Sequence, residues 1–433
     1  MHIVIIGNGI TGITCAINLR RMDSSAEISI ISAESKYFFS RTALMYIYMG
    51  HMKYEHTKPY EDWFWEKNRI NLVQGTVKNI TTEFKVVSLE DGRTLHYNML
   101  VIASGSIPNK FGWTGENLKG VQGLYSLRDL EEMESNTRDI SEAVIVGGGL
   151  IGIEMAEMLL SRKIKVHFLV RENYYWSNIL AEEEAKLVSS HIREHHINLL
   201  LQSELKEIRA DESGKVKSVL TLSGNEIPCQ FVGLTAGVTP NVSFLANSGI
   251  HVNRGVLVNE FLETNVPNVY AAGDCAEFTK PQPGHPAVEQ LWYTGKMQAE
   301  ALAKTLCGKR TAYQRGIWFN SAKFLDIEYQ TYGMMLPELT EDQESFYWEH
   351  PEGRIALRAT YNRYDRSITG FNFLGIRFRQ AIAEEWIRSK KPVDQCIREL
   401  EAGWFQTELS KPFYKDILNA FSACTDFKPV AVN

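Results

Sequence analysis

The sequence predicts an α/β protein with two similar parallel-sheet units, the second inserted into the first, and a C-terminal α+β segment. Three observations predict this fold class. A short apolar run, a glycine-rich loop and a helical pattern follow one another in residues 2–19 and again in residues 143–160. Turns of small residues at 103–109 and 235–241 flank the second unit, as two chain crossovers would. Aromatic-rich strand patterns begin only after about residue 310.

The first unit opens with a strand at 2–6, because this run is apolar, β-branched and too short for a helix. The loop Gly7–Gly12 has the spacing G-x-G-x-x-G, and residues 13–19 are predicted as a helix. The first glycine allows a tight turn, the second lets a pyrophosphate approach the backbone, and the third lets helix and strand pack closely. Between a strand and a helix, this motif predicts a dinucleotide site at the helix N-terminus. An ordinary tight turn is the alternative.

A second strand is predicted at 27–32, and it ends next to Glu34. An acidic residue about 20 positions after such a loop is expected to accept hydrogen bonds from the adenosine ribose. A solvated strand-end glutamate is the alternative. Arg41 follows in a loop or helix start, where it would neutralise the pyrophosphate or lie on the surface.

Residues 46–67 are rich in tyrosine and tryptophan, which is typical of packing rather than of a substrate site. Alternating apolar stretches from Ile70 onward, around Gly92, predict a β-meander or hairpin. A buried strand at 99–102 then ends in the small-residue turn 103–109, which would permit the close approach of a ligand.

The second unit repeats the first. A strand is predicted at 143–146, the loop Gly147–Gly152 has glycines at 147, 149 and 152, and a helix is predicted at 153–160. Two such units in one chain are far more specific than one. They predict either two dinucleotides or one duplicated domain with a degenerate copy.

The second strand of this unit, at 165–170, ends in Val170-Arg171-Glu172. An acid at the strand end would favour NAD, whereas an arginine beside it accommodates the 2′-phosphate of NADP. Because Val170 occupies the acid's position and Arg171 follows, the sequence favours NADPH. Glu172 is one step away, so NADH stays open.

A hairpin is predicted at 215–228 and a strand at 229–234, before the second small-residue turn. The strand at 269–276 has a Gly273-Asp274 exit, where the carboxylate could bind a polyol chain. A helix is predicted at 289–306.

The C-terminal segment carries no catalytic motif and is expected to pack or dimerise. Its strands and helices are predicted at 318–319, 324–332, 346–348, 355–361, 368–373, 379–389 and 393–402.

The composition excludes several classes of protein. The formal net charge is −6, so no basic balance favours nucleic acid. No apolar run approaches the ~20 residues that span a bilayer. The first strand begins at residue 2, which predicts no signal peptide and a cytoplasmic location. The six cysteines have no zinc-ligand spacing and are expected to be free thiols, and no metal is expected.

The five motifs in this order resemble the pyridine-nucleotide-disulfide oxidoreductase superfamily of flavoproteins. They are 7–12, 103–108, 147–152, 237–241 and 272–274, and the likeness covers roughly residues 1–310. Within that superfamily the chain is most similar to the rubredoxin-reductase and apoptosis-inducing-factor-like branch.

The resemblance implies two Rossmann-like domains of the three-layer ββα type. It implies an FAD domain at 1–111 and 236–310, an NAD(P)H domain at 112–235, and a C-terminal α+β interface domain at 311–433. It implies FAD contacts at Gly7, Gly9, Ile10, Thr11, Gly12, Glu34, Arg41, Thr42, Ala103, Ser104, Gly105, Gly237, Gly273 and Asp274. It implies NAD(P)H contacts at Gly147, Gly149, Ile151, Gly152 and Arg171, with Glu154 beside the nicotinamide and flavin rings.

The chain departs from the family pattern at the redox cysteine. Thr42 occupies the position of the single cysteine, and a hydroxyl cannot cycle through a disulfide or sulfenate. Tyr46 stands where some branches have a lysine near the flavin. Disulfide reduction through this loop is therefore not expected.

These features predict an FAD-dependent NAD(P)H oxidoreductase without a catalytic thiol. The expected acceptor is a rubredoxin- or ferredoxin-like carrier, with a quinone or oxygen second, and a homodimer is possible. The alternative is a redox-sensing flavoprotein that binds a partner through its C-terminal domain.

Overall fold

The computed structural model describes residues 1–405 and 411–424. The chain divides into two compact units, which we describe separately. Unit 1 comprises residues 1–140, 210–216 and 230–315, and unit 2 comprises residues 141–209, 217–229 and 316–433. The predicted three-domain division is finer than these two units and stays a proposal.

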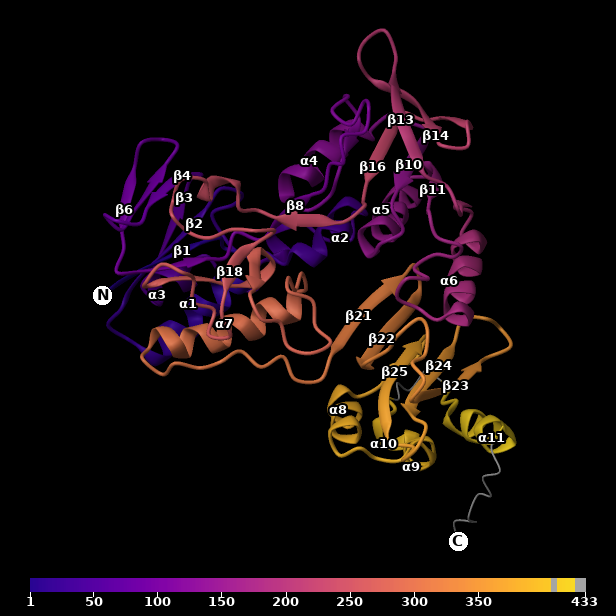
Figure 1. The fold of residues 1–433 in the computed structure, drawn as a ribbon. Helices are drawn as coiled ribbons and strands as arrows, with labels where there is room; N and C mark the ends of the chain where they lie inside the picture. Colours follow the sequence, from indigo (N-terminus) through magenta and orange to yellow (C-terminus); the bar gives the residue numbers. More distant parts are fainter. Residues whose placement is uncertain (406–410, 425–433) are drawn as a thin grey trace. The chain divides into compact units, whose positions relative to one another are not determined.

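Unit 1 is built on a parallel five-stranded sheet with the strand order β19-β7-β1-β2-β3 (Figure 1). Four of its strands are almost wholly buried, as the apolar runs predict for a parallel sheet covered on both faces, whereas the edge strand at residues 70–74 is partly exposed. The strands are β1 (His2–Ile6), β2 (Glu27–Ser32), β3 (Ile70–Gln74), β7 (Met99–Ile102) and β19 (Val269–Ala271).

Two helices of unit 1 pack tightly against each other, α1 (Ile10–Met22) and α7 (Trp292–Leu306), and they lie side by side in Figure 1. Gly295 permits this approach, since a Cβ there would lie 2.5 Å from Oγ1 of Thr11. Helix α7 begins at Trp292 and not at Glu289, so the predicted start was wrong by three residues. The reason is that Glu289 and Gln290 form side-chain hydrogen bonds in an extended segment.

Smaller elements complete unit 1. The meander predicted from Ile70 onward begins only at Val77, as an antiparallel sheet of three strands, because residues 70–74 pair with β2 in the parallel sheet. The two small-residue turns each carry a short strand, β8 and β17, which pair with each other. Strands β9 and β16 pair in parallel, as do β18 and β20. The bounds are η1 (Arg41–Ala43), α2 (Leu44–Tyr48), η2 (Tyr54–Thr57), α3 (Trp63–Lys67), β4 (Val77–Thr81), β5 (Val86–Leu89), β6 (Thr94–His96), β8 (Ser106–Pro108), β9 (Val121–Gln122), α4 (Leu127–Asn136), β16 (Phe231–Leu234), β17 (Val238–Pro240), η3 (Ser243–Leu245), β18 (Val256–Val258), η4 (Gly273–Cys275) and β20 (Ala276–Phe278).

Unit 2 contains the second strand–loop–helix repeat. Strands β10, β11 and β12 pair in parallel, and helix α5 follows β10 directly. The predicted hairpin is confirmed as β14 and β15. The bounds are β10 (Glu142–Val146), α5 (Leu150–Ser161), β11 (Lys165–Leu169), α6 (Glu182–Glu194), β12 (Asn198–Leu200), β13 (Leu205–Ala210), β14 (Val216–Thr221) and β15 (Glu226–Pro228).

The C-terminal part of unit 2 is an antiparallel five-stranded sheet with the order β21-β22-β25-β24-β23 and a core of its own. The predicted strand at 324–332 is interrupted, because Leu325 and Asp326 form the turn of a hairpin, with Leu325 in the left-handed region at φ 59°. The bounds are β21 (Phe319–Phe324), β22 (Ile327–Gly333), β23 (Gln343–Glu349), β24 (Ala356–Asn362), β25 (Ile368–Leu374), α8 (Gln380–Arg388), α9 (Val393–Arg398), α10 (Leu400–Gly403) and α11 (Tyr414–Cys424).

Candidate functional site

The first glycine loop joins β1 to α1, and its three glycines are in different surroundings. A Cβ at Gly7 would overlap the carbonyl of Ala103, and one at Gly12 would overlap the carbonyl of Gly7. By contrast, a Cβ at Gly9 would have no atom within 4 Å. Gly9 is also the N-cap of α1 and provides no side-chain cap. The helix N-terminus therefore faces open space with uncapped N–H groups, which suits a pyrophosphate.

The turn after β7 lies directly against this loop. Ser104 donates a hydrogen bond to the carbonyl of Asn241 at 2.7 Å, and Asn241 N–H donates to the carbonyl of Gly105 at 2.9 Å. Gly105 has φ 70°, and a Cβ there would lie 2.8 Å from the hydroxyl of Tyr125. Gly237, with φ 95°, begins the second turn and accepts a bond from the Asn109 N–H. The two predicted crossovers are thus tied together.

Glu34 and Arg41 form a two-pronged ion pair. Arg41 Nη1 and Nη2 donate to the two carboxylate oxygens of Glu34 at 3.0 and 2.6 Å, and the Leu127 N–H donates to the same carboxylate at 2.6 Å. The guanidinium also lies 4.5 Å from the ring centre of Tyr125. Burial lowers the pKa of Arg41, but Glu34 more than offsets this, and the net shift is upward. Glu34 is therefore not a free, solvated strand-end acid.

Asp274 lies in η4, at the carboxyl edge of the sheet. The hydroxyls of Ser106 and Tyr125 each donate to its Oδ2 at 3.3 Å. Burial raises the pKa of Asp274, and these hydrogen bonds oppose the rise. Gly273 packs against the Thr11 side chain, and its N–H donates to Gln298 at 2.7 Å.

The sequence analysis missed three residues of this network, namely Tyr125, Ser106 and Gln290. Gln290 donates to the Ser106 hydroxyl at 2.9 Å, and Tyr125 bridges the Arg41 and Asp274 ends of the network. Tyr125 lies 84 positions after Arg41 and belongs to no motif. Ser106 alone carried a signal, because it lies in the small-residue turn after β7.

Residues 33–48, which include Thr42, contain no cysteine. The Thr42 hydroxyl lies 3.0 Å from that of Ser40. Cys275, next to Asp274, is fully buried, and its thiol donates weakly to the carbonyls of Ile102 and Ala272. Burial raises the pKa of this thiol, so the reactive thiolate is disfavoured.

The second glycine loop joins β10 to α5 in unit 2. Gly147 has φ 113°, and its N–H donates to the carbonyl of Leu169 at 3.0 Å. Gly149 is the N-cap of α5 without a side-chain cap, and Ile151 and Gly152 lie in the first turn of the helix. The Tyr175 hydroxyl holds the Gly149 carbonyl at 3.0 Å. The loop thus repeats the helix N-terminus without a side-chain cap that the first unit has.

The Glu172 carboxylate lies beside this loop. A Cβ at Gly148 would lie 3.0 Å from Val170 and 3.7 Å from Glu172 Oε2. Arg171 is 73% exposed, and its Nε donates to Glu172 Oε1 at 2.8 Å. A carboxylate that suits a ribose diol and a guanidinium that suits a 2′-phosphate therefore occupy the same strand end.

Glu154 lies in the second turn of α5. Burial, and then the nearby charge of Glu157, raise the pKa of Glu154 to about 7. An acid that changes charge near neutral pH is typical of functional sites, although buried structural acids show the same shift.

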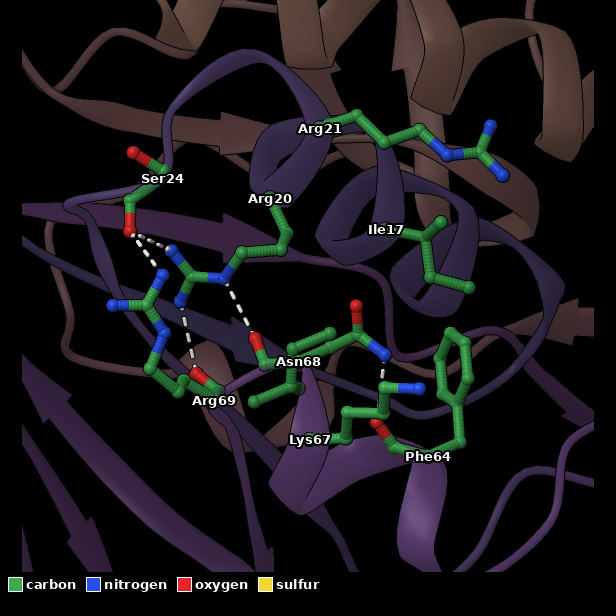
Figure 2. A pocket seen from close by; sticks show the side chains of 9 residues that line it. Ile17, Arg20, Arg21, Ser24, Phe64, Lys67, Asn68 and Arg69 are labelled. Atoms are coloured by element: carbon green, nitrogen blue, oxygen red, sulfur yellow. Dashed lines mark hydrogen bonds between the residues drawn. The ribbon is translucent and has the colours of Figure 1, made fainter.

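A pocket of about 430 Å³ lies elsewhere in unit 1, at the C-terminal end of α1 (Figure 2). Arg20, Arg21, Lys67 and Arg69 give it a basic lining. Because the glycine loop is at the opposite end of α1, this pocket is separate from the predicted dinucleotide site.

Comparison with known proteins identifies the family. The model of the pyridine nucleotide-disulphide oxidoreductases matches residues 1–298, more than half of the chain. The chain belongs to this family. The resemblance and the fold class read from the motifs are confirmed, with FAD and NAD(P)H as the family's cofactors.

Individual relatives are more distant. Nitrite reductase [NAD(P)H] of Bacillus subtilis (strain 168) is 29% identical over 331 residues, which cover 76% of this chain and 40% of that protein. Rubredoxin-NAD(+) reductase of Ectopseudomonas oleovorans is 26% identical over 72% of this chain and 81% of its own. The chain thus spans about two fifths of the length of the nitrite reductase.

Solved structures support the same fold. A ferredoxin reductase from Rhodopseudomonas palustris superposes with a TM-score of 0.78 at 23% identity, covering 86% of this chain and 91% of the other. Within residues 1–405 and 411–424, no helix is long and apolar enough to cross a membrane.

The residues present fit both cofactors. Each glycine loop leaves an uncapped helix N-terminus for a pyrophosphate, and the space beside Gly9 is open. Polar groups that can accept or donate hydrogen bonds, Glu34 and Asp274, lie in the same unit as the first loop.

Proposed function

We propose that this chain is an FAD-dependent NAD(P)H oxidoreductase that passes electrons to a small iron–sulfur carrier, without a catalytic disulfide. A quinone or oxygen is the second acceptor we propose. One observation supports this above the others: a single chain has two glycine loops at helix N-termini without side-chain caps, while the flavin-side loop carries Thr42 in place of a cysteine.

FAD, when bound, accepts a hydride from a nicotinamide and releases the electrons to an acceptor. The protein binds and orients the two cofactors. In unit 1, the backbone of Gly7–Gly12 would hold the FAD pyrophosphate, with Ile10 and Thr11 in the first helical turn. Ala103, Ser104 and Gly105 would line the same side of the site.

The network between Glu34 and Asp274 would position the rest of FAD. Oε1 of Glu34 accepts from Arg41 Nη1 and from the Leu127 N–H, so Oε2, which accepts from Arg41 Nη2, is the oxygen that would accept a further hydrogen bond from a ribose. Asp274, held by Ser106 and Tyr125, would bind the ribityl hydroxyls. The resemblance to the family implies that Arg41 contacts FAD. We propose that Arg41 instead acts as a positioning residue, because it holds Glu34.

In unit 2, Gly147, Gly149, Ile151 and Gly152 would bind the NAD(P)H pyrophosphate, and Glu154 would lie beside the nicotinamide. NADPH remains our proposal, because Arg171 is exposed at the strand end and free to turn from Glu172 to a phosphate. NADH is the second candidate, supported by the Glu172 carboxylate next to Gly148.

Flavin reduction tests the proposal directly. The purified full-length protein, loaded with FAD, is mixed with NADPH and in parallel with NADH, and flavin bleaching is followed by stopped flow. We expect rapid bleaching by both and faster bleaching by NADPH. Equal rates, or faster bleaching by NADH, would overturn the NADPH assignment, and no bleaching by either would overturn the proposed function.

Turnover separates the enzyme from a redox sensor. With ferricyanide or a purified rubredoxin or ferredoxin, an oxidoreductase consumes NAD(P)H continuously. The alternative is a sensor that binds a partner through its C-terminal part. It would take up one equivalent, reoxidise slowly and change its mass on reduction, as measured by light scattering. A homodimer and a cytoplasmic location stay predictions.

A further inference from the structure

We infer that unit 2 contains a binding site for a divalent metal ion of the zinc class, formed by His191, His195 and Asp326. The two histidines lie on α6 and at its C-cap, and Asp326 lies in the turn between β21 and β22. One ligand atom from each residue lies within 4.8 Å of the others. The proposed cofactor sites use none of these residues.

The helix places both imidazoles on one face. Residues four apart are neighbours along a helix, so His191 and His195 can point the same way. Their ring centres are 4.6 Å apart, and the Nε2 atoms of both rings meet the same carboxylate oxygen, Oδ1 of Asp326. The distance from His195 Nε2 to that oxygen is 3.0 Å.

The hairpin turn presents the carboxylate. Leu325 is buried and has φ 59°, an uncommon conformation for a residue with a branched side chain, and it turns the chain so that Asp326 faces α6. Asp326 is 55% exposed, whereas His191 is 1% exposed. Packing therefore fixes the His191 side chain, whereas the Asp326 side chain can adjust its position.

The ligand set selects the ion. Two imidazole nitrogens and one carboxylate oxygen suit zinc, nickel, cobalt or copper, whereas calcium and magnesium prefer oxygen alone. In a tetrahedral zinc site, bonds of about 2.0–2.1 Å put ligand atoms about 3.3 Å apart. A small outward movement of the exposed Asp326 side chain would reach that spacing.

The surrounding charges are compatible with this site. The buried Nδ1 of His191 has no hydrogen-bond partner among the described residues, and Glu194 Oε2 lies 3.6 Å from it. Metal-bound histidines commonly donate their other N–H to a carboxylate, and Glu194 could serve so. The cation Arg354 lies 3.8 Å from Asp326 Oδ2, the oxygen that faces away from the histidines, and 3.4 Å from Glu194.

A bound ion would join α6 to the C-terminal sheet. His195 and Asp326 are 131 positions apart in the chain, so the ion would close a long loop of the chain. An ion that binds the folded but not the unfolded chain raises the unfolding temperature by mass action. The site is thus expected to stabilise the protein and not to take part in electron transfer.

The test uses untagged, FAD-loaded, full-length protein, treated with a chelator and then titrated with Zn²⁺ by calorimetry and with Co²⁺ by visible absorption. We expect one tight equivalent, a ligand-field spectrum with Co²⁺, and a higher unfolding temperature with Zn²⁺. His195→Ala and Asp326→Asn should each weaken Zn²⁺ binding by roughly 10- to 100-fold. Flavin content and circular dichroism confirm that each variant folds.

His196→Asn is the matched control. His196 is adjacent to His195 but outside the cluster, and asparagine tolerates its φ of 62°. This variant should bind Zn²⁺ as the wild type does. The inference is overturned if the wild type binds no equivalent of Zn²⁺. It is equally overturned if both site variants bind as tightly as the wild type, or if Zn²⁺ leaves the unfolding temperature unchanged while Asp326→Asn lowers it.

Discussion

The three glycines of the first glycine loop differ in the space that a Cβ would find. Gly7 and Gly12 are required by the fold itself, because any Cβ there would overlap backbone carbonyls. Gly9 has an ordinary φ of −70° and open space around it, so only a ligand can require a glycine there. The same motif therefore contains two structural glycines and one that we propose serves cofactor binding.

Gly9→Ala and Gly7→Ala should therefore fail in different ways. Gly9→Ala is expected to fold with an unchanged unfolding temperature for the flavin-free form but to retain less FAD, because the methyl group fills the phosphate space. Gly7→Ala should be destabilised, since its φ of 110° and the Ala103 carbonyl both exclude a Cβ. Flavin content and thermal melts measure the two effects. Full FAD retention by Gly9→Ala would contradict the site.

We propose that the choice of nicotinamide cofactor depends on Arg171. Arg171→Ala should raise the KM for NADPH by roughly tenfold or more, because a hydrogen bond to a charged group contributes about 1.5–3 kcal/mol. The KM for NADH should stay unchanged. Glu172→Gln is the matched variant, and it should raise the KM for NADH more than the KM for NADPH. An unchanged preference in Arg171→Ala would remove this residue from the site.

The raised pKa of Glu154 predicts that the stability of the folded protein depends on pH. Its pKa is raised from 4.5 to about 7 in the folded protein, first by burial. A raised carboxyl pKa contributes stability that is complete below about pH 4.5 and is lost as the pH rises through 7. At about 1.4 kcal/mol per pKa unit, the loss is on the order of 3 kcal/mol.

Thermal melts between pH 5 and pH 8 test this expectation. The unfolding temperature of Glu154→Gln should fall less with rising pH than that of the wild type, because the amide does not ionise. Glu131→Gln, an exposed residue of α4, is the control and should follow the wild type. Parallel curves for the wild type and Glu154→Gln would show that this carboxyl titrates normally.

At the scale of elements, the C-terminal end of α1 is held by Arg20. Its guanidinium donates five hydrogen bonds, all to backbone carbonyls, and Figure 2 shows it between the α1 end and the α3–β3 connection. The positive charge also complements the C-terminal end of the helix dipole. The basic pocket is thus in part a structural junction between α1, β2 and β3.

Arg20→Ala should destabilise unit 1 by on the order of 2–3 kcal/mol, because five backbone carbonyls lose a charged donor, and three of these hydrogen bonds are partly buried. Arg21 is the neighbouring control. It is exposed and points away from these carbonyls in Figure 2, so Arg21→Ala should change stability little. Denaturant melts of both variants compare the effects, and equal stability of the two would contradict the assignment.

At the scale of the whole molecule, the distribution of thiols supports the proposed mechanism without a catalytic disulfide. Four of the six cysteines are buried, and Cys307 and Cys424 are exposed. Burial raises the pKa of both Cys229 and Cys396 to about 12. Buried thiols with raised pKa values are poor nucleophiles.

N-ethylmaleimide should therefore modify two cysteines of the native FAD-loaded protein, Cys307 and Cys424, and leave NADPH–ferricyanide turnover intact. Mass spectrometry of native and denatured samples counts the modified thiols, with all six expected after denaturation. Loss of turnover in step with the first modification would reveal a catalytic thiol and overturn the proposed mechanism.

Elements with a local signal were predicted well. The two strand–loop–helix repeats follow from short apolar runs and glycine spacing, and β2 ends where predicted, at Ser32. The interruption at Leu325 and the late start of α7 were not predicted, because each depends on contacts that the local pattern does not encode.

The sequence by itself determined the two dinucleotide loops, the family and its cofactors, because each motif acts through consecutive residues. Only the tertiary structure decided that Arg41 holds Glu34, that Tyr125 links Arg41 to Asp274, and that Glu172 lies next to Gly148. These contacts join positions up to 149 residues apart. These side chains meet only after the sheets have assembled, and their spacing in the sequence is not fixed. No sequence motif could therefore predict these contacts.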